Sequence, residues 1–95
     1  MAQACDYPPA VKIPDGKSAT QEEITTASAT VKKYLADMEA YTACLDAEFA
    51  ALPVDQQTPE AKGIQVKKYN AAVEAMEAEA LAFNEQLRAF KAANK

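Results

Sequence analysis

The chain has 95 residues, a mass of 10.2 kDa, a formal charge of −4 and two cysteines. Its ten basic residues are scattered, which argues against a nucleic-acid partner, because nucleic acids are bound through clustered basic residues. No run approaches about eighteen apolar residues, so no membrane span is predicted. We expect one small domain, residues 1–95, of a size that often needs a disulfide or a partner.

Residues 1–19 are predicted to form an extended strap. Prolines at 8, 9 and 14 fix φ and disfavour helix in the residue before them. Pro14-Asp15-Gly16 is typical of a turn. Apolar residues in this stretch, such as Val11 and Ile13, indicate that the strap lies on the protein.

The first residues bear on export. Ala2-Gln3-Ala4 resembles the end of a signal peptide, although the charged and apolar regions of such a peptide are missing. We interpret Met1 as a start residue placed where a removed signal ended, which predicts a periplasmic or secreted protein. The alternative is a native cytosolic start with two free thiols.

Two long helices are predicted from their boundary signals. Thr20 and Glu23 have the spacing of a capping box, and no helix breaker follows until Pro53. Thr58 suits an N-cap and Pro59 a first helical position. The expected elements are a helix over 20–52, a loop over 53–58 and a helix over 59–92.

Apolar residues recur along both helices at steps of three, four or seven, which places them on one helix face. In an antiparallel helix pair, the residue numbers of two facing positions should add up to a constant. A constant of 114 pairs Met38 with Met76 and Leu45 with Tyr69. Near the loop the same sum opposes Glu48 to Val66 and Leu52 to Lys62, so Glu48 is expected in solvent, or the helices splay there. The first stripe is Ile24, Val31, Met38, Leu45 and Leu52, and the second is Val66, Tyr69, Val73, Met76, Ala80, Phe83, Leu87 and Phe90.

The predicted fold is therefore all-α, a coiled-coil-like antiparallel two-helix hairpin with the extended N-terminal strap. The same stripes would also suit an intermolecular coiled coil, but the short capped loop favours the intramolecular pair.

Cys5 and Cys44 are predicted to form a disulfide that ties the strap to the first helix. From residue 44 to residue 20 the helix covers about 36 Å, and about fifteen residues of polyproline-like chain span up to about 46 Å. The bond would therefore reach. Free thiols or intermolecular bonds are the alternatives, and no Cys-x-x-Cys pair indicates redox catalysis.

No catalytic residue, metal site or cofactor is predicted, so the protein is not expected to be an enzyme. The chain has no histidine, which excludes the commonest general base, and it has no Gly-rich phosphate loop or zinc spacing. Glu74, Glu77 and Glu79 are interpreted as a solvated helix face.

Two residue sets are candidates for function. An apolar flank beside the seam suggests contact with a protein partner or a homodimer, unless its residues are ordinary exposed apolar side chains; it comprises Leu35, Phe49 and Leu81. Core packing is the first interpretation of the tyrosines on the predicted seam, Tyr34, Tyr41 and Tyr69. A small apolar ligand between the strap and the helices is the alternative, with Tyr34, Tyr41 and Tyr7 as the candidate ligand residues.

A longer pattern runs through the first half of the chain. It reads Cys5-x-Tyr7-Pro8, Pro14-Asp15-Gly16, Ala19-Thr20-x-Glu22-Glu23, Val31-Lys32-x-Tyr34 and Met38-Glu39-x-Tyr41-x-x-Cys44-Leu45. This resembles small exported proteins of proteobacteria that carry signal peptides. The resemblance implies export and no assigned catalytic residue. The expected function is a non-enzymatic structural or protein-interaction module of the bacterial envelope or secreted space, with a small carrier of an apolar ligand as the alternative.

Overall fold

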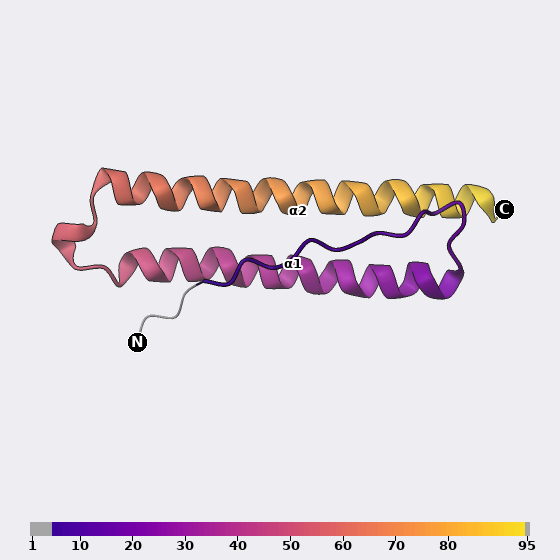
Figure 1. Ribbon diagram of the computed structural model, residues 1–95, viewed down its shortest axis with the longest axis horizontal. Helices are drawn as coiled ribbons and strands as arrows, with labels where there is room; N and C mark the ends of the chain where they lie inside the picture. The colour runs from indigo at the N-terminus through magenta and orange to yellow at the C-terminus, as the bar shows by residue number, and fades with distance from the viewer. Residues whose placement is uncertain (1–4, 95) are drawn as a thin grey trace.

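The computed structural model describes residues 5–94 and shows two antiparallel helices with an extended segment beside them (Figure 1). Helix α1 covers Gln21–Ala50, a short 3₁₀ helix η1 covers Val54–Gln56, and helix α2 covers Pro59–Ala93. The predicted all-α hairpin is thus confirmed. The interpretations of residues 1–4 lie outside the described residues.

Both helices begin where their capping residues predict. The Thr20 hydroxyl accepts from the Glu23 amide, and the Glu23 carboxylate accepts from the Thr20 amide, which completes a capping box. The Thr58 hydroxyl accepts from the Ala61 amide, and Pro59 occupies the first turn of α2.

Helix α1 ends at Ala50, two residues earlier than predicted. Pro53 disfavours helical geometry in Leu52, so the last turn tightens and the Leu52 amide donates to the Phe49 carbonyl. The Gln57 side chain then donates to the Leu52 carbonyl at 2.8 Å. The predicted loop over 53–58 contains η1, and α2 extends one residue beyond the expected end.

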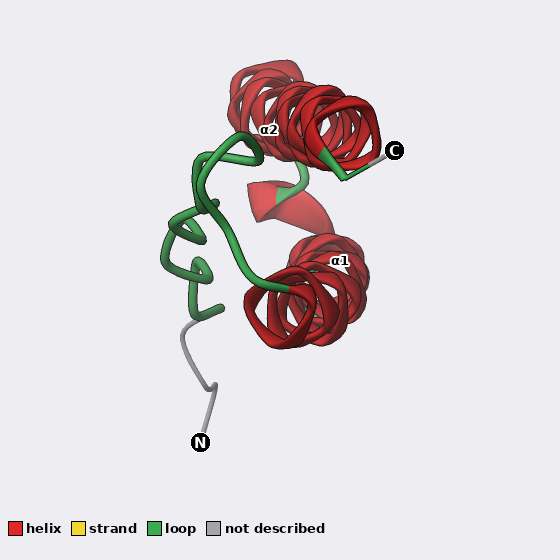
Figure 2. Cartoon of the chain, turned by 90° about the vertical axis from the view of Figure 1, so that its right-hand side faces the viewer, coloured by secondary structure: helices red, strands yellow, loops and turns green. Residues whose placement is uncertain are grey.

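The strap runs from Cys5 along the line between the helices to the C-terminal end of α2, where it turns back to Thr20 (Figure 1). Viewed along the helices, it lies on one side of the pair (Figure 2). The Asp15 carbonyl accepts from the amides of Ser18 and Ala19, which fixes the predicted turn. The strap is thus a third packed element on that side only.

Gly16 brings the strap against the backbone of α2. Its amide donates to Gln86 Oε1 at 2.8 Å, and a Cβ built on it would collide with the Gln86 carbonyl. The turn therefore requires glycine for close approach rather than for an unusual φ, because no glycine among the described residues has a positive φ.

The predicted disulfide is present. Cys5 and Cys44 are joined with their Cα atoms 5.7 Å apart, which is ordinary disulfide geometry. Of the described residues, no cysteine is free. The bond fixes the start of the strap near the loop-side half of α1.

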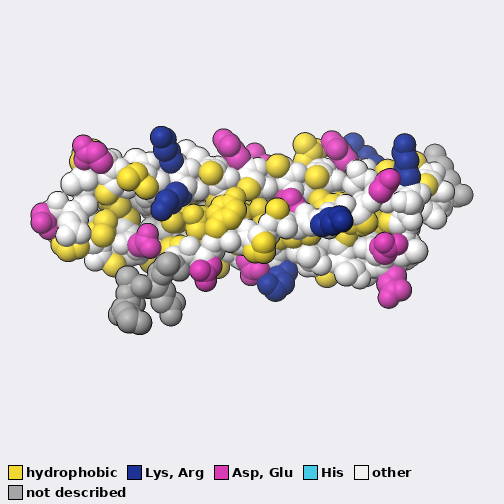
Figure 3. Space-filling view, in the orientation of Figure 1, with side chains coloured by type: hydrophobic (Ala, Val, Ile, Leu, Met, Phe, Trp, Pro, Cys, Tyr) yellow, Lys and Arg dark blue, Asp and Glu magenta, His cyan; other side chains and the backbone are white. Residues whose placement is uncertain are grey.

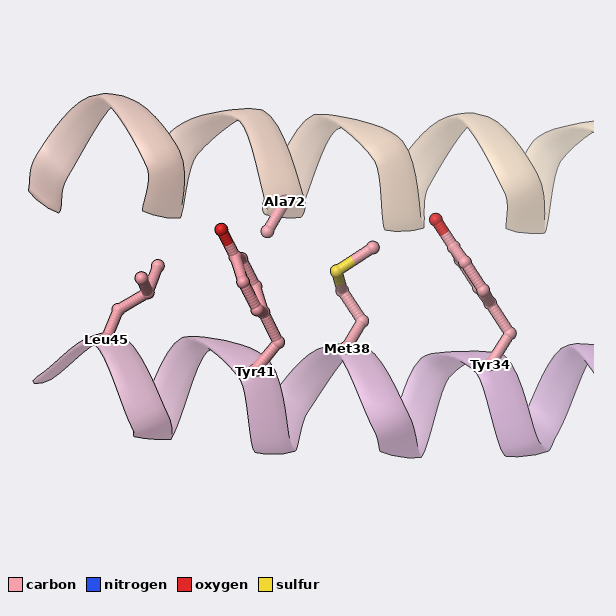
Figure 4. Packing of buried hydrophobic residues seen from close by; sticks show 5 residues of the cluster. All are labelled: Tyr34, Met38, Tyr41, Leu45 and Ala72. Carbon is pink, nitrogen blue, oxygen red and sulfur yellow. The ribbon is translucent and has the colours of Figure 1, made fainter. Parts of the chain in front are cut away.

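The core is a single row of side chains, most of which come from α1 (Figure 4). Met38 is completely buried at its centre, and Cys5 and Val11 of the strap pack against the cluster. The row comprises Tyr34, Met38, Tyr41, Leu45 and Ala72. At the far end Ile24 and Phe90, whose residue numbers also sum to 114, are both buried, in agreement with the predicted pairing.

The predicted inner face of α2 is wrong in the loop-side half of the helix. Val66 and Tyr69, expected in the seam, are 42% and 38% exposed, whereas Gln65 and Ala72 are buried. The Gln65 amide group donates to Asp46 Oδ1, so a polar contact replaces the apolar layer expected there. The inner face of α2 is turned away from its most apolar stripe.

Candidate interaction surface

Tyr34 and Tyr41 belong to the core cluster. Both are buried, and their rings extend from α1 towards α2 on either side of Met38 (Figure 4). Tyr7 remains 53% exposed and meets Tyr41 edge to face, with 5.2 Å between ring centroids. That pair anchors the strap where the disulfide begins it.

A polar group lies within this core. Glu79, predicted to be solvated, is half-buried, and its Oε1 is fully buried with no hydrogen-bond partner. Burial raises the pKa of Tyr34 above its ordinary value of 10.0, and the charges of Tyr7 and Glu79 raise it further. The Tyr34 phenol therefore stays neutral at physiological pH and is not a nucleophile there.

An open groove of about 430 Å³ lies between the strap and α1. Tyr7 and Tyr41 line it, together with Asp6 and Asp37, but Tyr34 does not. The structure therefore does not gather the three tyrosines around one cavity. The carrier of an apolar ligand stays a prediction from the sequence.

The three predicted interface residues lie in different surroundings. Leu35 is half-buried and packs against the core, and Phe49 is half-buried with Lys62 Nζ 5.0 Å from its ring centroid. Leu81 is 55% exposed on α2, two residues from the inward-facing Glu79 and hence on the outer face of the helix. They do not form one patch, and an interface role for each stays a prediction from the sequence.

A different apolar surface faces away from the strap. Asp46 lies about 200° around α1 from the strap-bearing Cys44, so Asp46 marks the opposite flank. We call this flank of the helix pair the open side, because no other described segment covers it (Figure 2). The stripe predicted for the seam borders this side and is half-buried or exposed along its length; we call it the open-side stripe, and it comprises Val66, Tyr69, Val73, Met76, Ala80, Phe83 and Leu87.

Two shallow grooves lie at the ends of the open-side stripe. Near the loop, Val66 and Tyr69 line a groove of about 310 Å³ with Asp46 of α1. At the other end, Phe83 and Leu87 line a groove of about 430 Å³ with Ile24, Ser28 and Lys32, among others. The groove at the Phe83 end is lined mainly by apolar surface, whereas the groove near the loop mixes Val66 and Tyr69 with polar side chains. Such combinations of apolar and charged residues are found at docking surfaces.

The strap-bearing side also combines apolar and charged side chains. Figure 3 shows its hydrophobic side chains gathered along the line between the helices, where the strap packs, with many charged side chains around them. Within residues 5–94, no group of three or more Cys, Asp and Glu side chains is placed to hold a metal ion. No described helix is both long and apolar enough to cross a bilayer.

Sequence reasoning missed the polar residues that set the orientation of α2. Gln65, Glu79 and Gln86 share a heptad face with Ala72, and two of the three bind another element: Gln65 contacts Asp46 of α1, and Gln86 contacts Gly16 of the strap. Their seven-residue spacing was the available signal, but a search for apolar periodicity passes over it.

Comparison of the chain with models of protein families, with curated proteins and with solved structures finds no match. Proposals about function therefore rest on the residues and their geometry.

Proposed function

We propose that this protein is a non-enzymatic structural or protein-interaction module that works in the bacterial envelope or secreted space. The observation that carries the proposal is the open-side stripe, an apolar face of α2 that the strap does not cover, with Val66 and Tyr69 exposed and the other five residues half-buried. The tethered strap packs on the other side of the same helix pair. A partner bound to the open side would bury the apolar residues that the two helices leave partly exposed.

Surface chemistry supports a docking role. Tyr69 and Val66 are both exposed, and aromatic and large apolar side chains are enriched at protein interfaces. Single exposed apolar residues are ordinary, but this stripe continues over seven positions of one helix face. The chain also lacks histidine, and the Tyr34 phenol, whose pKa is raised by burial, is unsuited to catalysis at neutral pH.

The disulfide supports the proposed compartment. Disulfides persist in oxidising environments and are rare in the cytosol, where thiols are kept reduced. Cys5 and Cys44 are joined through a bond of ordinary geometry. Export therefore accounts for a fold whose third element is held by this bond.

Photo-crosslinking in the host cell tests the interaction role. A benzophenone amino acid is placed at Tyr69 in one variant and at Leu81 in the control, because both side chains are exposed on α2 but on different faces. We expect protein adducts from position 69 and markedly fewer from position 81. Equal adduct yields, or no adduct from position 69, would overturn the proposed interaction surface.

Fractionation of the same cells tests the compartment. We expect the protein in the envelope or secreted fraction with both cysteines protected from alkylation. Recovery in the cytosol with both thiols reactive would overturn the export part of the proposal.

A further inference from the structure

The molecule exposes more surface than a monomer of its mass usually does. Its accessible surface is 6739 Å², whereas globular monomers of this mass average about 5,300 Å². Its Cα radius of gyration is 17.5 Å, against about 12 Å for a compact chain of this length. The excess of about 1,400 Å² is comparable to the total area that a typical stable protein interface buries.

The open side is large enough for such an interface. The molecule extends 61 Å along the helices and 23 Å across the pair, and the open side is one of its two broad faces (Figures 1 and 2). Each partner of a typical interface contributes about 800 Å², which is less than this face offers. A short peptide would leave most of the open-side stripe uncovered, whereas a second helix pair matches its length.

Charged residues along the α1 edge of the open side form a self-complementary pattern. Lys32 lines one groove and Asp46 the other, and Glu39 lies midway at the same heptad position. Lys32 and Glu39 are one heptad apart, with the half-buried Leu35 between them. When two such edges run antiparallel, Lys32 of each copy faces Glu39 of the other, which gives two pairs of opposite charges.

We propose that the partner of the open side is a second copy of this chain, which makes a four-helix bundle with the two straps on its outer faces. The two α1 helices run antiparallel about a twofold axis beside Leu35, so that Lys32 of each copy faces Glu39 of the other. This inference rests on the proposed function, because it names the partner of the same surface. The symmetry gives a closed, isologous interface.

Charge reversal tests the pairing directly. Sedimentation equilibrium of the oxidised full chain at low salt, up to about 0.5 mM, should show a dimer. Lys32→Glu and Glu39→Lys should each weaken self-association by about tenfold, because each places like charges across the axis. The double variant Lys32→Glu/Glu39→Lys should restore it to within about threefold, because opposite charges then face each other again.

Lys67→Glu is the matched control, because it makes the same charge change on the outer face of α2, about 200° from the buried Gln65. It should leave self-association unchanged, and circular dichroism should show that all four variants are folded. A wild-type chain that stays monomeric throughout, or a double variant as weak as the single ones, would overturn the second copy as partner. If cross-links from Tyr69 then lead to a different protein, the proposed function stands without the dimer; if Tyr69 gives no adduct, both fail.

Discussion

The two sides of the helix pair differ in how their apolar residues are covered. On one side the strap covers the seam, with Pro8 buried, Val11 packed on the core and the Cys5–Cys44 bond holding its start. On the open side the apolar residues of α2 remain half-buried or exposed. A two-helix hairpin has one seam and two flanks, and residues 5–94 supply a cover for only one of them. This difference is the basis of the interaction surface proposed for the open side.

Among the changes considered, removal of the disulfide should reduce the unfolding free energy most, because it releases the strap that covers one side. The Cys5→Ser/Cys44→Ser variant should lose about 4 kcal/mol of unfolding free energy, because a loop of about 40 residues is no longer closed in the unfolded chain. Urea titration of the variant and the oxidised wild type measures the difference. A loss below about 1 kcal/mol would show that the strap holds without its bond.

Truncation of side chains on the two sides should separate core from open surface. Met38→Ala should cost about 3 kcal/mol, because Met38 is completely buried between the helices. Val66→Ala should cost less than about 1 kcal/mol, because Val66 is 42% exposed on the open side. Both values come from urea titration at a concentration where the protein is monomeric, and similar costs would contradict the observed orientation of α2.

The two glycines offer a matched test of strap docking. Gly16→Ala should cost about 2 kcal/mol, because its Cβ would collide with the Gln86 backbone and displace the turn. Gly63→Ala should instead stabilise the protein by up to about 1 kcal/mol, because no atom lies near its Cβ position and alanine favours the helix. Thermal unfolding of both variants measures the opposite signs, and a neutral Gly16→Ala would mean that the strap end is loosely held.

Alkaline pH should change the unfolding free energy least. The pKa of Tyr34 is raised in the folded protein, chiefly by burial, so above pH 10 the unfolded chain loses this proton before the folded one does. The Tyr34 contribution to the unfolding free energy should therefore be constant below pH 10 and fall as pH rises through the folded-state pKa. Tyr34→Phe should make the decline shallower, and an unchanged slope would show that Tyr34 ionises equally easily in both states.

The sequence was sufficient to predict the features that depend on local residue signals or on the distance that a chain segment can span. Capping residues gave the helix starts, Pro53 bounded α1, and the distance from Cys44 to Thr20 made the disulfide possible. The orientation of α2 was not predictable from apolar spacing, because two polar contacts decide it: Gln65 with Asp46, and Gln86 with Gly16. Because α2 is rotated about its axis relative to the predicted orientation, Tyr69 lies at the surface rather than in the expected core.

The candidate site was predicted less well for the same physical reason. A stripe that is more apolar than its neighbours is assigned to the core by any periodicity argument, so the open-side stripe could not be recognised as surface. The flank of Leu35, Phe49 and Leu81 was expected instead, but their positions depend on the rotation of each helix about its axis. Only the packed structure determines that rotation.

Carbene footprinting of the monomeric protein, read by mass spectrometry before and after reduction, tests the central contrast most directly. In the oxidised protein, Tyr69 and Val66 of the open side should label strongly, whereas Tyr41 and Tyr34 should label weakly beneath the strap. Reduction of the Cys5–Cys44 bond should raise labelling of Tyr41 and leave that of Tyr69 unchanged. Strong labelling of Tyr41 in the oxidised protein, or protection of Tyr69 in the monomer, would contradict a hairpin that is covered on one side and open on the other.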